Sequence, residues 1–510
     1  MEDEAPLLVD ISSGFKEDST PSSSPSHDEI CKYILSRATL TAPLQILESS
    51  IPSAGLGLFA TEDIPAAQDI FTSQPFMSCP ISGPGDSECQ IKAWKEYHKH
   101  ECKEFQANPS LYKKDEVRSS KRVEFILQNS ESTVAAMNIA VLGMFRANER
   151  LKIIEEELGM SQKDPSVLED LLATDISELE YLLATKMITH MVPIQVPDGG
   201  SFHTAGRSLD FTSALINHSC IPNTILFFDG RIARARSLKP IKAGEELLRC
   251  YAEISQPILL RQQGLPYHGA LTSQGIVCTR CEEELKEIEE WGSKKPELKH
   301  PLSCLRKAQS KLLMKMLEIK AGLITPQELS IYIRPLAKEL FPDGIWPDHI
   351  EPIPRINKFC GDYYYNKKLG NLGLKYHLRG ILCMEIRHCA EFVRLFMMMV
   401  YMMDMFLWSM RKASSSARSK MRKEGIPTEK EMTIVHQGYA HELARICVSL
   451  FGPDIAWSKA IVGLKEKAFN LPGSNRARLS VKEFDAAQSK LLAWATVEEN
   501  RKIVLTDVSD

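Results

Sequence analysis

The sequence predicts an α+β fold in which small β-sheets precede a helical C-terminal region. Short apolar segments alternate with glycine and proline over residues 34–81 and again over 190–252, as expected for strands and turns. Apolar residues recur at three- and four-residue spacing between residues 106 and 185, and again from about residue 302 to the end. That second spacing is typical of helices that bury one face.

The first strands are expected in LQILES (44–49), GLGLFATEDI (55–64) and QDIFTSQPF (68–76). Aromatic and β-branched residues bounded by turn formers favour strands in these segments. The apolar spacing then predicts a helix over 123–158, a break at Asp164-Pro165 and a second helix over 168–187.

A second group of strands follows the helices. It is expected in ILFFDG (225–230), RIARARSL (231–238) and ELLRCY (246–251), and Lys242-Ala243-Gly244 supplies a turn between the last two. Further helices are predicted in the C-terminal region at 304–322, 439–452 and 481–502. Paired antiparallel helices of the kind found in repeat modules fit this region.

Length and composition restrict the class of protein. A chain of 510 residues is too long for one hydrophobic core, so we expect two or three domains. A net charge of -4 gives no reason to expect nucleic acid or an anionic membrane as a direct partner. No apolar secretory segment opens the sequence, so the 13 cysteines are expected to be thiols or metal ligands in the cytoplasm, the nucleus or both.

Two segments of the C-terminal region need separate interpretation. The apolar run from Leu395 to Trp408 contains Asp404. It is shorter than the ~20 residues that a membrane span requires, so we expect a buried helix. The basic, serine-rich segment 411–425 is expected to form a solvated loop between helices.

The segments with the most informative chemistry lie far apart in the sequence. NHSCIPN, from Asn217 to Asn223, packs polar side chains densely enough to fix an irregular loop through hydrogen bonds to its own backbone. KAGEELLRCYAE follows, with Tyr251 at the end of the predicted strand. A tyrosine in that position can place its hydroxyl in a pocket. Upstream, Gly55 and Gly57 would let the backbone approach a ligand closely.

Taken in this order, these segments resemble the SET-domain family of protein-lysine methyltransferases. GLGLFA is similar to the first motif of that family, NHSCIPN to its third and GEELLRCY to its fourth. The helical insertion and the helical C-terminal region resemble the SET-and-MYND (SMYD-like) branch. The resemblance covers residues 42–282 well and the rest of the chain loosely.

The resemblance implies SET-type sheets around a knot-like loop and S-adenosylmethionine as the cofactor. The acidic, serine-rich composition of residues 1–33 predicts a disordered tail. The resemblance implies the domains that follow: a SET domain (34–255) interrupted by a MYND-like segment (86–105) and a helical insertion (106–185), a post-SET segment (256–300) and a helical domain (301–510). It also places the cofactor against the following residues: Ala54, Gly55, Leu56, Gly57, Asn217, His218 and Tyr251.

The implied reaction is an in-line transfer of a methyl group from a sulfonium to a neutral lysine amine, with Tyr251 as the catalytic tyrosine. The partner would be a protein with an exposed lysine, histone or non-histone. Alignment of donor and acceptor lowers the barrier, and burial beside a positive sulfonium lowers the pKa of the lysine. The alternative is a SET-like binding or scaffold protein that has lost activity, because the sequence departs from the family pattern at Ile276 and Gln274.

The resemblance also implies zinc sites, of which this sequence retains only parts. Cys220, Cys278 and Cys281 match three ligands of one site, and Ile276 replaces the fourth. Structural zinc almost always has four ligands, so these cysteines are either zinc ligands or buried thiols.

The MYND-like segment departs further from the family pattern. It keeps Cys89, His98 and Cys102 but lacks the preceding cysteine pairs, which predicts a broken or absent finger. The segment before the third motif also departs, because His190 falls where the family often has asparagine.

Overall fold

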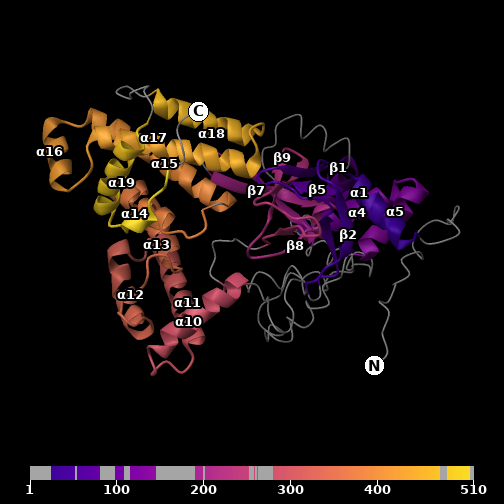
Figure 1. Cartoon of the computed structure of the whole chain (residues 1–510), viewed down its shortest axis with the longest axis horizontal. Helices are drawn as coiled ribbons and strands as arrows, with labels where there is room; N and C mark the ends of the chain where they lie inside the picture. Colours follow the sequence, from indigo (N-terminus) through magenta and orange to yellow (C-terminus); the bar gives the residue numbers. More distant parts are fainter. Residues whose placement is uncertain are drawn as a thin grey trace. The chain divides into compact units, whose positions relative to one another are not determined.

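The computed structural model of the chain describes residues 25–51, 54–80, 98–107, 115–144, 190–198, 201–251, 258, 261, 279–387, 389–470 and 479–505. The chain divides into two compact units. The first comprises Met1–Val196, His203–Tyr251 and Gln262–Ile276, and the second comprises Pro197–Phe202, Ala252–Arg261 and Val277–Asp510. Figure 1 shows strands with short helices in the first unit and mainly helices in the second.

Among the described residues, the strands form four small sheets. The largest sheet is antiparallel and has the strand order β1 (Ala38–Leu40), β4 (Asp69–Ser73), β10 (Ile232–Ser237) and β9 (Thr224–Asp229). A second antiparallel sheet pairs β2 (Leu44–Glu48) with β3 (Leu56–Ala60). A third has the order β5 (Met77–Pro80), β7 (Ser201–Leu209) and β6 (Val192–Asp198), and its β5–β7 pair is antiparallel. The fourth pairs β8 (Asn217–His218) in parallel with β11 (Leu248–Arg249). With the helices described below, these sheets confirm the predicted α+β class.

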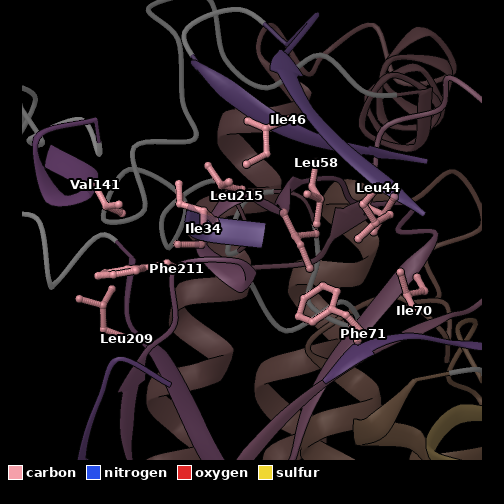
Figure 2. Close-up of a cluster of buried hydrophobic side chains, with 14 of the residues drawn as sticks. Ile34, Leu44, Ile46, Leu58, Ile70, Phe71, Val141, Leu209, Phe211 and Leu215 are labelled. Atoms are coloured by element: carbon pink, nitrogen blue, oxygen red, sulfur yellow. The ribbon is translucent and has the colours of Figure 1, made fainter. Parts of the chain in front are cut away.

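The core of the first unit lies between these sheets and the first helix. Figure 2 shows apolar side chains from α1 (His27–Ser36), β2, β3 and β4 gathered in one cluster. Leu58 of β3 and Phe71 of β4 are fully buried. Burying side chains of this size contributes about 1.5–3 kcal/mol each, which holds short strands that would not persist alone.

Helix α1 corrects the predicted boundary of the N-terminal tail. The helix begins at His27, inside the range 1–33 that we expected to be disordered. The Ser26 side chain accepts from the Glu29 backbone N–H while the Glu29 carboxylate accepts from the Ser26 backbone N–H. This capping box, together with the buried Ile30 and Ile34, stabilises a helix that the polar composition concealed.

The helical insertion is described in part. It contains α4 (Asp115–Gln128) and α5 (Ser132–Met144), whereas α3 (Lys99–Ala107) lies mainly in the preceding MYND-like segment. The single helix expected over 123–158 is wrong at its start, because α4 ends at Gln128. There the Asn129 and Ser130 side chains donate to the carbonyls of Phe125 and Ile126, four residues earlier. Such bonds compete with the helical pattern. The helix expected over 168–187 lies outside the described residues.

The second unit consists of helices with short connections. They are α10 (Thr279–Ser293), α11 (Pro301–Lys320), α12 (Pro326–Leu340), α13 (Ile353–Asn366), α14 (Gly370–Leu382), α15 (Ala390–Lys412), α16 (Ser415–Lys423), α17 (Glu429–Phe451), α18 (Ala456–Phe469) and α19 (Val481–Ala495). Helix α13 packs on α14, and α17 packs on α15, α18 and α19.

The two C-terminal segments singled out in the sequence have different outcomes. Leu395–Trp408 lies within α15 and contributes Met399 and Met403 to the core, so the predicted buried helix is confirmed. None of the described helices is long and apolar enough to cross a membrane. The loop expected at 411–425 is wrong, because α16 forms there with Ser414 as its N-cap, although none of its residues is buried.

Candidate functional site

A parallel pairing of two very short strands brings the third and fourth motifs together. Asn217 lies opposite Leu248, and His218 lies opposite Arg249. The Ser219 backbone N–H donates to the Arg249 carbonyl at 2.9 Å, which extends the pairing by one residue. Two-residue strands bury little surface, so side chains must supply the remaining stabilisation.

Asn223 supplies part of this stabilisation, because its side-chain amide forms hydrogen bonds with the backbone of the neighbouring strand. Its Nδ2 donates to the Glu246 carbonyl at 2.8 Å, and its Oδ1 accepts from the Leu248 backbone N–H at 2.8 Å. Its own backbone N–H donates to the Leu248 carbonyl at 3.1 Å. The last asparagine of NHSCIPN therefore fixes the loop against the strand that leads to Tyr251.

Asn217 ties this loop to the first motif. Its Nδ2 donates to the Leu56 carbonyl at 3.0 Å and to Glu246 Oε1 at 2.7 Å. The other carboxylate oxygen of Glu246 accepts from Ser49 Oγ at 2.9 Å. One amide and one carboxylate thus connect segments on either side of the helical insertion.

The glycines of the first motif are required by this arrangement. A Cβ atom on Gly57 would lie 2.2 Å from Glu246 Oε1, closer than real Cβ contacts, and 3.2 Å from Asn217 Nδ2, which is tight. Gly55 has a φ of 78°, in the left-handed region that favours glycine. Gly57 thus allows the backbone to lie close to the Glu246 side chain, and the expected approach to a ligand stays a prediction.

Tyr251 is held at both its backbone and its hydroxyl. Its hydroxyl donates to the Ile216 carbonyl at 2.9 Å, and its backbone N–H donates to His218 Nδ1 at 3.0 Å. Because Nδ1 accepts, the neutral imidazole carries its proton on Nε2, which lies 3.3 Å from Cys220 Sγ. The Arg249 guanidinium carbon lies 4.3 Å from the centroid of the Tyr251 ring.

Burial controls the charges in this region. It raises the pKa of Tyr251, an effect that the positive charge of Arg249 opposes. Burial also raises the pKa of Glu246, against the hydrogen bonds from Asn217 and Ser49. The Tyr251 hydroxyl is therefore protonated at neutral pH.

The structure brings together the residues that the sequence singled out for the cofactor site. Leu56 and Gly57 contact Asn217 or its partner Glu246, and His218 contacts Tyr251. Ala54 and Gly55 directly precede these residues at the end of a turn in which the Ala54 backbone N–H donates to the Ile51 carbonyl.

Sequence reasoning missed the residues that organise the site. Glu246 was available as a signal, because it is the second acid of GEELLRCY. Ser49, Arg249 and the carbonyl of Ile216 carried no signal that a sequence pattern could report.

The cysteines expected to bind zinc fall in different parts of the chain. Cys220 lies in the first unit, whereas Cys281 lies in α10 of the second unit and accepts from Arg261 Nη2 at 3.6 Å. Cys278 lies outside the described residues, as do Gln274 and Ile276. In the part of the chain that the structure describes, no group of three His, Cys, Asp or Glu side chains could hold a metal ion.

The MYND-like segment and His190 are only partly described. Cys102 lies in α3, where it accepts from Gln106 Nε2 at 3.6 Å, and His98 directly precedes this helix. Cys89 lies outside the described residues. His190 lies two residues before β6. The zinc ligands and the broken finger therefore stay predictions.

Comparison with known proteins agrees with this geometry. A family model described as "SET domain" matches residues 55–252. One curated relative is "SET domain and MYND-type zinc finger protein 6" of Schizosaccharomyces pombe, which is 36% identical over 94 residues (18% of this chain, 19% of the relative). Another is "Histone-lysine N-methyltransferase SMYD3" of Homo sapiens, which is 23% identical over 219 residues (41% of this chain, 49% of the relative). These matches span about a fifth to a half of the relatives' length.

A search of solved structures gives a looser similarity. The "Crystal structure of the SET domain of LSMT bound to MeLysine and AdoHcy" covers 88% of this chain and 94% of its own, with 11% sequence identity and a TM-score of 0.30. That TM-score is too low to support further conclusions. Residues 55–252 thus match the SET-domain family, and parts of the chain are similar to SET-and-MYND proteins.

Proposed function

We propose that this protein transfers the methyl group of S-adenosylmethionine to lysine side chains of other proteins, histone or non-histone. The observation that carries the proposal is the network in which Asn217 joins the Leu56 carbonyl to Glu246, beside the His218–Tyr251 contact. Relatives named as histone-lysine and N-lysine methyltransferases support it.

The residues of this network fit the cofactor. Both contacts formed by the Asn217 amide within the described residues use Nδ2, so Oδ1 can accept from the amino group of the methionine portion. The backbone of Ala54, Gly55, Leu56 and Gly57 would line the same site. When bound, S-adenosylmethionine supplies an electrophilic methyl group on a positively charged sulfur.

The residues around Tyr251 suit the amine that must attack. The Tyr251 hydroxyl donates a hydrogen bond to the Ile216 carbonyl, so its oxygen can accept a hydrogen bond from the N–H of a lysine amine. The lysine must lose a proton first, and the positive charge of Arg249 beside the ring lowers the pKa of an amine held there. The chain would thus orient the amine and keep it neutral.

The test is a labelling reaction that contains the full chain, S-adenosylmethionine with a radioactive methyl group, and whole-cell extract. We expect labelled lysines with the wild-type protein and almost none with Tyr251→Phe. Tyr401→Phe is the matched control, because Tyr401 is 46% exposed on α15 and outside the site.

Calorimetry with S-adenosylhomocysteine separates this proposal from the alternative function. Saturable binding supports the enzyme. No heat of binding at millimolar ligand, together with no labelling, would instead support a SET-like scaffold without activity.

A further inference from the structure

Arg249 carries a charge for which the described residues provide no partner. Its backbone is fixed by pairing with His218, and its guanidinium lies over the Tyr251 ring. Its Nε is buried and has no hydrogen-bond partner among the residues that the structure describes. Within the described ranges, no carboxylate forms an ion pair with it, and Tyr251 and Cys250 are the titratable groups that act on its charge.

A more deeply buried arginine of the same unit is neutralised by a carboxylate. Arg236 is 8% exposed, and its Nη1 lies 2.5 Å from Asp69 Oδ1. An arginine in a protein does not lose its proton, so burial without an anion carries a large desolvation cost. Among the described residues, the fold therefore supplies a carboxylate for Arg236 and none for Arg249.

Glu246 does not fill this role. Its two carboxylate oxygens accept from Asn217 and Ser49. Both oxygens are thus engaged by groups other than Arg249, and no ion pair joins Glu246 to Arg249 within the described residues.

We propose that Arg249 binds a carboxylate of the ligand that occupies the Tyr251 site. This inference rests on the proposed function, and it assigns a chemical class to what the site binds. A carboxylate can accept two parallel hydrogen bonds from a guanidinium. Its negative charge would offset the positive charge of Arg249, which would otherwise lie near the positive sulfonium of the cofactor. Two sources carry this group: the amino-acid portion of the cofactor, or an aspartate or glutamate beside the lysine of the substrate.

The first experiment tests the cofactor as the source. Calorimetry compares wild type and Arg249→Met with S-adenosylhomocysteine and with its decarboxylated analogue. If the cofactor supplies the carboxylate, Arg249→Met should lower the affinity for S-adenosylhomocysteine about tenfold to a hundredfold, the usual range for losing a charged hydrogen bond. The analogue should bind both proteins with similar affinity.

The second experiment tests the substrate as the source. Lysine peptides with Asp or Glu at flanking positions are compared with their Asn or Gln counterparts in the methylation assay. Wild type should favour the acidic peptides about tenfold or more in kcat/KM. Arg249→Met should lose that preference, and Arg249→Glu should disfavour acidic peptides.

Lys412→Met is the matched control, because Lys412 Nζ lies 3.9 Å from the Trp408 ring centroid in the second unit. Arg249→Lys serves if Arg249→Met unfolds, since it keeps the charge but lacks the fork and should give an intermediate loss. Unchanged cofactor affinity together with unchanged peptide preference would overturn the inference and leave the proposed function intact. A wild-type protein that binds no S-adenosylhomocysteine would overturn both.

Discussion

The site of the SET domain and the helical second unit are stabilised in different ways. In the site, the two-residue strands β8 and β11 are joined by amide and carboxylate side chains such as Asn217 and Glu246. In the second unit, long helices such as α15 and α17 bury apolar side chains along most of one face. The site depends on the identity of single polar atoms, whereas the helices depend on side-chain volume.

This difference separates activity from stability. A hydrogen bond in the site contributes about 1 kcal/mol net, but a buried partner left without it costs more and moves the groups it positioned. In a packed helical core, a changed volume or a buried charge alters the free energy of unfolding. Four substitutions or conditions test this separation.

The largest effect is expected for Tyr251→Phe. Loss of the hydroxyl removes the group that would orient the amine, so methyl transfer should fall about 10²-fold or more. The ring shape is kept, and the free energy of unfolding should fall by only about 1 kcal/mol, from the lost bond to the Ile216 carbonyl. Turnover with the radiolabelled cofactor and urea unfolding measure the two effects. Equal turnover of variant and wild type would remove Tyr251 from the mechanism.

Gly57→Ala should impair the site next most strongly. The new methyl group would overlap Glu246 Oε1 and displace the carboxylate from Asn217. Overpacking of this kind costs about 1–3 kcal/mol, and affinity for S-adenosylhomocysteine should fall about tenfold or more. Calorimetry on Gly57→Ala, Glu246→Ala and the double variant measures the coupling. We expect a double variant less impaired than the sum of the single losses, and strict additivity would contradict the overlap.

The second unit should lose stability in mild acid through His436 of α17. The side chain is 1% exposed, and burial lowers its pKa to about 4 against the charge of Asp404. The unfolded histidine takes up its proton near pH 6.5, so this stability is present above pH 6.5 and is lost as the pH falls toward 4. Urea unfolding should show a loss of about 2 kcal/mol from pH 7 to pH 5.

His436→Gln should reduce that loss, because glutamine does not titrate. His300→Gln, at an exposed position, is the control and should keep the wild-type dependence. A wild-type free energy of unfolding that is equal at pH 7 and pH 5 would exclude this role for His436.

The smallest effect is expected for Gly463→Ala in α18. Apart from the nearby backbone of α18 itself, no described atom lies within 4 Å of the added Cβ, and alanine favours a helix over glycine, so stability should rise by about 0.5–1 kcal/mol. Gly425→Ala is the matched comparison, because its Cβ also meets open space but its φ is 74°. That variant should lose about 1 kcal/mol. Thermal unfolding that shifts both variants in the same direction would contradict this explanation.

Much of the fold follows from local patterns. The apolar spacing predicted α11, α17 and α19, and it identified Leu395–Trp408 as a buried helix. Local patterns failed where side chains compete with the backbone, as at Asn129 and Ser130 at the end of α4. They also failed at α16, because a basic, serine-rich composition does not by itself distinguish an exposed helix from a loop.

The sequence alone determined the motifs that contain Gly57, Asn217 and Tyr251, because each motif is a short run of residue types that can be recognised without its surroundings. Only the tertiary structure decided what these residues bind. Asn217 meets the Leu56 carbonyl across 161 positions and Glu246 across 29, and the guanidinium of the half-buried Arg249 lies on the Tyr251 ring. Such contacts form only when folding brings together atoms that are remote in the sequence. Burial in the site then shifts the pKa values of its ionisable side chains and makes an unpaired polar group costly.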